Sequence, residues 1–141
     1  MAIQYRLVPT PNPKGEKGKT YYRARVIKVD DYTPEAMAAD VNNSTTMSEA
    51  DVDGVLTAIS KQMLKELLAG RTIVLKGIGR LTVGMDSRAI PEEEISKKGF
   101  RPTDYINSLH VNFIPEPRVK KLLNDKRNLK RIRKIPPQDE K

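Results

Sequence analysis

The sequence contains no cysteine, and this absence removes whole classes of chemistry. Disulfides, thiolate metal sites and cysteine nucleophiles are excluded, and an intracellular address is favoured. No stretch approaches the roughly 20 apolar residues that a membrane span requires. The first residues, MAIQYRLVPTPNP, lack the basic segment and apolar run of a signal peptide. We therefore expect a cytoplasmic protein without a membrane partner.

Groups suited to enzyme chemistry are also scarce. His110 is the only histidine and falls in an expected strand, where a half-exposed structural role is favoured over general-base catalysis. Glu92, Glu93 and Glu94 could suggest a magnesium site, but adjacent carboxylates in a loop are usually solvated. We predict a protein that is not an enzyme and that needs no cofactor, metal or small-molecule substrate.

Positive charge is what the sequence has in excess. Over 141 residues, 26 Lys and Arg face 18 Asp and Glu, which gives a net charge of +8. Nine of these cations lie between Arg118 and Lys134 with a single acid, Asp125, whereas residues 1–117 carry only +1. A local excess of this kind is typical of proteins that bind nucleic acid.

The N-terminal segment alternates residue types as a strand does. Ile3, Tyr5 and Leu7 alternate with polar residues, and a turn-rich stretch separates them from a second extended run, YYRARVIKV. We predict an N-terminal β-hairpin over residues 1–31. Its tyrosines could stack on bases, although cross-strand packing is favoured.

Two helices are expected next. Thr-Pro-Glu at 33–35 supplies a cap, a first-turn proline and an acid, so a short helix should run to about Asn42. Ser48 and Asp51 approximate a capping box, and apolar residues then recur at spacings of three and four as far as Leu68. A glycine soon after Leu68 favours the end of this second helix.

The rest of the chain alternates between strand and turn signals. RTIVLK and RLTVGM, separated by Gly77-Ile78-Gly79, predict a tight antiparallel pair, and LHVNFI predicts a last strand that leads into a C-terminal helix. Glycine and proline interrupt residues 85–108, which we expect to form a long, mobile loop or arm.

Two of these segments carry a recognisable pattern. GRTIVLKGIGRLTV at 70–83 is similar to G-x-x-[VI]-x-L-x-G-[FI]-G-x-[FL]-x-V, and VNFIPEPRVK at 111–120 resembles V-x-F-x-P-x-x-K-L-K. Both patterns belong to the bacterial HU and integration-host-factor family of histone-like DNA-binding proteins. The resemblance spans about residues 32–124, and variants with an added N-terminal segment, common in Bacteroides-like bacteria, are closer still.

The resemblance implies an α+β fold in which an intertwined homodimer forms a helical base and an antiparallel β saddle that grips double-stranded DNA. Composition agrees independently, because about 90 residues with one long helix have too few layers to bury both faces of a sheet. We predict three parts: the hairpin extension at 1–31, an HU-like domain at 32–124 and a basic tail at 125–141.

The candidate DNA-binding residues are all cations. Lys76 and Arg80 bracket the glycine turn as a phosphate clamp would, although solvated surface cations would look the same. Arg118 and Lys120 match the family's basic pair, so the resemblance implies contact with DNA flanking the saddle. The full set is Lys76, Arg80, Arg88, Arg101, Arg118, Lys120, Lys121, Lys126, Arg127, Lys130, Arg131, Arg133 and Lys134.

The run from Lys126 to Lys134 holds six cations in nine residues. Leu129, Ile132 and Ile135 interleave with them, so the run could continue the helix, or it could be a disordered polybasic arm. Either form would attract phosphates by releasing counterions, without reading sequence. A membrane-surface role is disfavoured because large apolar residues are missing.

The expected arm departs from the family pattern. HU-type arms end in an R-N-P tip whose proline wedges between base pairs, and the nearest match here is Gly99-Phe100-Arg101-Pro102. A turn in which Phe100 covers a sheet edge is favoured over a wedge. The sequence thus indicates nucleoid-type binding of DNA through phosphates, with little sequence preference. There are two alternatives. One is a protein-interaction or scaffolding module that keeps the fold without binding DNA, and the other is an RNA-binding protein.

Overall fold

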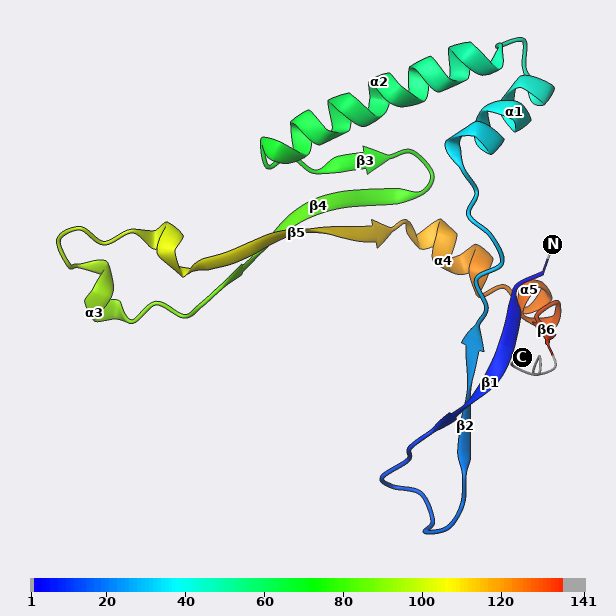
Figure 1. Ribbon diagram of the computed structural model, residues 1–141, viewed down its shortest axis with the longest axis horizontal. Helices are drawn as coiled ribbons and strands as arrows, with labels where there is room; N and C mark the ends of the chain where they lie inside the picture. Colours follow the sequence, from blue (N-terminus) through cyan, green and yellow to red (C-terminus); the bar gives the residue numbers. More distant parts are fainter. Residues whose placement is uncertain (1, 136–141) are drawn as a thin grey trace, which may run out of the picture. The chain divides into compact units, whose positions relative to one another are not determined.

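A computed structural model describes residues 2–135, which form two compact units (Figure 1). The terminal unit combines residues 2–33 with residues 120–135, and the central unit comprises residues 34–119. The hairpin and the C-terminal basic segment, which the sequence suggests as separate extensions, therefore share one unit. The predicted domain boundaries at residues 31 and 124 remain a prediction.

The central unit begins with two helices, α1 (Pro34–Ser44) and α2 (Glu49–Leu68), as predicted. Ser48 caps α2: its hydroxyl accepts the Asp51 N–H, and the Asp51 carboxylate accepts the Ser48 N–H, each at 3.2 Å. The Ser48 hydroxyl also donates to that carboxylate at 2.6 Å. These hydrogen bonds lower the pKa of Asp51, the side-chain bond having the larger effect.

The three-stranded sheet of the central unit has the order β3-β4-β5 and is antiparallel throughout. Its strands are β3 (Ile73–Leu75), β4 (Gly79–Ser87) and β5 (Ile106–Pro115). Gly77 has a φ of +77° in the turn between β3 and β4, a conformation that favours glycine. Gly79 is needed for another reason, because a Cβ there would overlap the Ile114 carbonyl oxygen.

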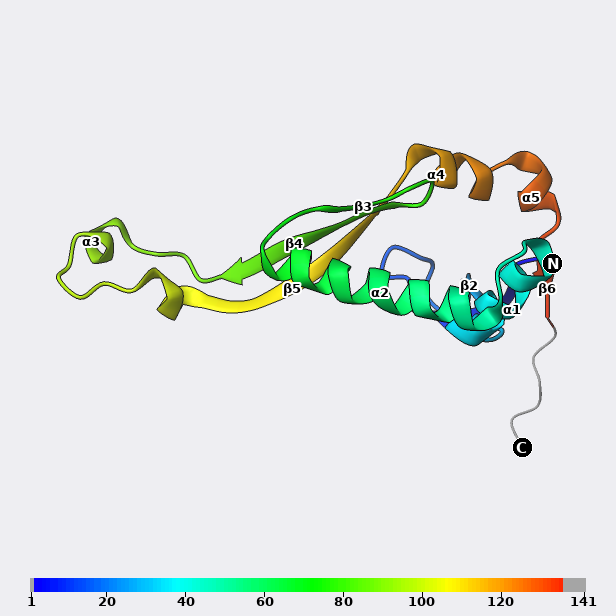
Figure 2. The ribbon, with the colours of Figure 1, turned by 90° about the horizontal axis from the view of Figure 1, so that it is seen from above.

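The arm differs from the prediction at both of its ends. The expected loop at 85–108 is wrong for its first and last three residues, because β4 continues to Ser87 and β5 starts at Ile106. Figure 2 shows these two strands continuing together beyond β3. The remaining segment contains two short elements, α3 (Glu92–Ile95) and a 3-10 helix, η1 (Pro102–Tyr105).

The two faces of the central sheet differ in chemistry. The register places Leu81, Val83 and Met85 of β4 opposite Phe113, Val111 and Leu109 of β5, so that one face is apolar. The other face alternates with it and is mostly polar, although Val74 and Ile114 lie on it beside Arg80. Yet the only buried hydrophobic side chains among residues 2–135 are Ala38 and Val52, one on each helix. The apolar face is therefore largely uncovered within one chain.

The terminal unit contains a second three-stranded sheet, with the order β2-β1-β6. The predicted hairpin is confirmed as β1 (Gln4–Thr10) and β2 (Tyr21–Val26). The third strand is β6 (Arg133–Lys134), which pairs with β1 in parallel. The Arg133 N–H donates to the Ile3 carbonyl and the Ile135 N–H to the Tyr5 carbonyl, both at 3.0 Å.

Two short helices precede β6, namely α4 (Pro117–Leu123) and α5 (Lys126–Lys130). The basic run is thus neither one continued helix nor a free arm as far as residue 135, and both forms suggested by the sequence are corrected. The last part of the predicted tail, residues 136–141, lies outside the described residues. The α+β class is confirmed, and no helix within residues 2–135 is long and apolar enough to cross a membrane.

Candidate nucleic-acid interface

Charge is divided unequally between the two units. The terminal unit, counted over residues 2–33 and 120–135, has 15 Lys and Arg against 4 Asp and Glu, a net charge of +11. The central unit has 10 Lys and Arg against 12 Asp and Glu, a net charge of −2. A polyanion is therefore attracted mainly by the terminal unit.

The β3–β4 turn holds the first candidate pair, Lys76 and Arg80. The Ile78 N–H closes the turn on the Leu75 carbonyl at 3.1 Å, and the Ile78 carbonyl accepts the Glu116 N–H at 2.8 Å. That second bond fixes the turn beside the segment that enters α4. Lys76 and the start of α4 are consequently neighbours, as a shared phosphate-binding edge would require.

Three candidates lie on α4, but helix geometry separates them. Arg118 and Lys121 are three residues apart and share a face, whereas Lys120 lies on a different side. The apolar residues of this short helix occupy positions 119, 122 and 123. The pair Arg118 and Lys120, which the family pattern suggests, therefore does not point at one phosphate.

The next four candidates, Lys126, Arg127, Lys130 and Arg131, lie on α5 or at its C-terminal end. Asp125 caps this helix by accepting the Arg127 N–H at 2.8 Å, and its carboxylate lies 3.5 Å from the Arg127 guanidinium. One of the four charges is thus partly balanced within the chain.

Of the two candidate cations in the arm, Arg88 and Arg101, the first interacts with other residues of the arm. The Arg88 guanidinium donates to the Asp104 carbonyl at 2.7 Å and lies 5.3 Å from the centre of the Tyr105 ring. Phe100 is half-buried, with its ring 5.9 Å from that of Tyr105. Phe100 thus packs within the arm, and Arg101 is left as the arm's candidate for phosphate contact.

The polar face of the central sheet has little positive charge. Asp86 and His110 lie on it, with the carboxylate 3.1 Å from His110 Nδ1, and the Ser108 hydroxyl donates to the same carboxylate at 3.2 Å. A Cβ at Gly84 would overlap the His110 ring, so the absence of a side chain lets the histidine lie across β4. Arg80 is the one lysine or arginine on this face within the paired strands.

Most of the candidate cations have no acidic neighbour. Within residues 2–135, no carboxylate lies within 4.0 Å of twelve of the thirteen predicted residues, and the exception is Arg127. Arg88 is also engaged, but with a backbone carbonyl. Sequence reasoning missed three further arginines in the terminal unit, Arg6, Arg23 and Arg25, although the alternation RxR in β2 already placed two of them on one face.

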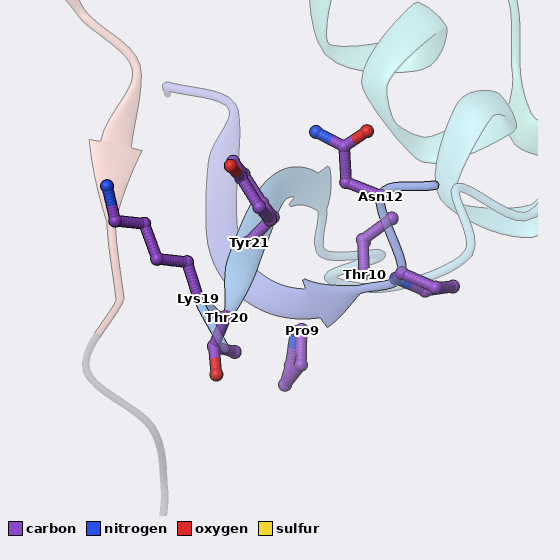
Figure 3. A pocket seen from close by; sticks show the side chains of 7 residues that line it. Pro9, Thr10, Asn12, Lys19, Thr20 and Tyr21 are labelled. Atoms are coloured by element: carbon purple, nitrogen blue, oxygen red, sulfur yellow. The ribbon is translucent and has the colours of Figure 1, made fainter. Parts of the chain in front are cut away.

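The hairpin end forms a shallow, open concavity of about 320 Å³ (Figure 3). Residues 9–12 and 19–21 line it, and none of them is an acid or a histidine. Tyr21 is held here, since its hydroxyl accepts the Glu16 N–H at 2.9 Å and its ring covers Gly15. This tyrosine closes the loop and is not free to stack on a base. In the described part of the chain, no three His, Cys, Asp or Glu are grouped to hold a metal.

Comparisons with known proteins agree with this architecture. The model of the HU-HIG family, described as an HU domain fused to wHTH, Ig, or Glycine-rich motif, matches residues 1–131. No curated protein matches the chain. A solved structure from Bacteroides vulgatus, of a protein named for an inferred role in bacterial DNA binding, is similar with a TM-score of 0.59 and 11% identity. The match covers 99% of this chain but 51% of that one, so the chain spans about half the length of its structural relative.

Proposed function

This chain belongs to the HU-HIG family of HU domains, and on that premise we propose that it binds double-stranded DNA mainly through phosphate contacts, with little sequence preference. Its role would be that of a histone-like, nucleoid-associated protein in the cytoplasm rather than that of an enzyme. The proposed contacts are the candidate cations named above, apart from Arg88, which is engaged within the arm.

The observation that carries this proposal is the net charge of +11 on the terminal unit. Eight of the thirteen candidates lie in that unit, from Lys120 to Lys134. Unpaired Lys and Arg displace the counterions condensed on DNA, which favours binding to any sequence.

The uncovered apolar face supports a homodimer as the DNA-binding form. Val111 and Phe113 of β5 remain 55% and 50% exposed, and on α2 Val55 and Ile59 remain 47% and 49% exposed. Side chains of this kind contribute about 1.5–3 kcal/mol each when fully buried. A second copy could cover them, giving the helical base and β saddle that the family resemblance implies.

One feature favours the scaffolding alternative. The polar face of the central sheet, which corresponds to the gripping surface of a saddle, presents Asp86 and only one lysine or arginine within its paired strands. If that face were the main DNA contact, its one acid and one cation would cancel and leave no net attraction for phosphate. A protein partner is then the second candidate, and RNA is the third.

Binding to duplex DNA, single-stranded DNA and structured RNA across a salt series separates these functions, with the mass of the free protein measured in the same buffer. If about five phosphates are neutralised, log K should fall with log salt with a slope of about −4 to −5. Duplex binding with that slope supports the proposal. Absence of duplex binding at 50 mM salt or below would exclude it, and a monomer would exclude the HU-type dimer.

A further inference from the structure

The register of the terminal sheet gathers four arginines on one of its faces. Arg6 pairs directly with Arg25, and Arg23 lies two residues from Arg25 along β2. Arg133 of β6 pairs with Gln4, two residues from Arg6 along β1. Because side chains alternate across a sheet, all four project from the same side. We call this surface the arginine face.

The arginine face contains no acid. Its other members in the paired strands are Gln4, Val8, Thr10 and Tyr21. All four arginines are exposed, and within residues 2–135 no carboxylate lies within 4.0 Å of any of them. The charge is therefore uncompensated by the part of the chain that the structure describes.

Folding alone does not account for this arrangement. Like charges directly opposite each other on neighbouring strands destabilise a sheet, and Arg6 and Arg25 are such a pair. The opposite face of the same sheet, with Leu7, Ala24 and Val26, shows that apolar residues suit these strands equally well. A cluster that weakens the sheet is explained if an anion neutralises it.

The dimensions of the arginine face suit a nucleic-acid backbone. Three neighbouring strands span roughly 10 Å, and Arg23 and Arg25 stand roughly 7 Å apart along β2. A DNA strand has one phosphate for about every 3.4 Å of helix axis, so the face could meet about three phosphates. Arginine also binds phosphate through two parallel N–H groups, which lysine cannot do.

We propose that the arginine face is a second phosphate-binding surface, distinct from the candidates on the central sheet and on α5, and that it takes the backbone of duplex DNA. This inference rests on the proposed function. It also gives the parallel strand β6 a role, since Arg133 joins the face only when the C-terminal segment pairs with β1.

The test compares two charge-matched double variants of the full chain. Arg6→Gln/Arg25→Gln removes the opposed pair, and Lys14→Gln/Lys17→Gln removes two loop cations that have no ion pair within residues 2–135. We expect the first variant to lower the salt slope by about 2 and the duplex affinity roughly 50-fold at 0.1 M salt. The loop variant should change the affinity less than about 3-fold, because it lowers only the net charge, whose effect at a distance is screened by salt.

Urea unfolding of the same variants distinguishes the loss of a DNA contact from the loss of folded structure. Since the opposed arginines repel each other, the unfolding midpoint of Arg6→Gln/Arg25→Gln should stay or rise while its affinity falls. Arg6→Lys/Arg25→Lys should keep most of the salt slope. If the arginine and loop variants bind alike, or if affinity and midpoint fall together, the inference is overturned and the proposed function stands. If the wild-type chain does not bind duplex DNA, both fail.

Discussion

The terminal and central units differ in two properties that the proposed DNA binding requires, namely shape and positive charge. The central unit has the two helices α1 and α2, the longer sheet and the arm, but its net charge is −2. The terminal unit is made of two short segments from opposite ends of the chain, and its net charge is +11. Shape and charge, which a saddle-shaped DNA-binding protein would combine on one surface, are separated here.

This difference changes which surface should be tested first. The family pattern directs attention to the central sheet and the start of α4. The charge distribution directs it to α5, to β6 and to the arginine face. On this account the central unit supplies the dimer, and the terminal unit supplies most of the attraction to phosphate.

The largest expected effect comes from removing charge from the terminal unit. A variant with Lys126, Arg127, Lys130 and Arg131 changed to Gln should lose about 1,000-fold in duplex affinity at 0.1 M salt, and the salt slope should drop by about 3 to 4. The matched control changes Lys61, Lys65, Lys97 and Lys98 of the central unit to Gln and should lose less than about 5-fold. Equal losses, measured by fluorescence anisotropy, would remove the distinction between the units.

A single charge on the apolar face should break the dimer. Val111→Asp places a carboxylate where the partner is expected, and an unpaired buried charge costs at least about 3 kcal/mol, equivalent to about a 100-fold weaker dimer. Asn112→Asp, its neighbour on the polar face, is the control and should leave the dimer intact. Sedimentation equilibrium measures both. If Asn112→Asp dissociates the dimer instead, the faces have been assigned the wrong way round.

A smaller change tests whether the polar face of the central sheet meets DNA at all. Asp86→Asn removes the carboxylate beside His110 and Ser108. A phosphate about 6 Å away in water would then gain roughly 0.7 kcal/mol, or about 3-fold in affinity. Asp53→Asn on α2 is the control and should change nothing. An unchanged affinity for Asp86→Asn would place DNA wholly on other surfaces.

The last prediction concerns the stability of the central unit and leaves DNA affinity aside. Ser48→Ala removes the cap of α2 and should destabilise the fold by about 1 kcal/mol in urea unfolding. Because the folded-state pKa of Asp51 is lowered, its contribution is present above the ordinary value of 3.8 and is lost as pH falls through the lowered one. The difference between wild type and Ser48→Ala should therefore shrink in acid. A difference that grows toward acid would contradict this cap.

Local elements could be predicted because their signals lie within a few residues. The cap at Ser48 and the end of α2 follow from neighbouring positions. At that end the Arg71 N–H bonds to the Glu66 carbonyl at 3.0 Å around Gly70, whose φ is +76°. The hairpin follows from alternation in the same way.

Long-range pairing could not be predicted. β6 has two residues, and its partners Gln4 and Tyr5 lie at the other end of the chain, so no local pattern marks it. The arginine face depends on the register across a ten-residue loop, which alternation alone does not set. The cations of the basic run were visible in sequence, but Arg6, Arg23 and Arg25 were missed because residues 1–117 together carry only +1, a sum that conceals a net charge of +4 over residues 1–31.

The most direct test of the account is to map the DNA contact residue by residue in solution. Amide chemical shifts of the labelled full chain would be followed by NMR while a 20-base-pair duplex is added at 0.1 M salt. The account predicts the largest shifts in β1, β2, α5 and β6, with Arg6, Arg25 and Arg133 among them. Shifts confined to β4, β5 and the arm would contradict it and would indicate that the central unit contacts the DNA.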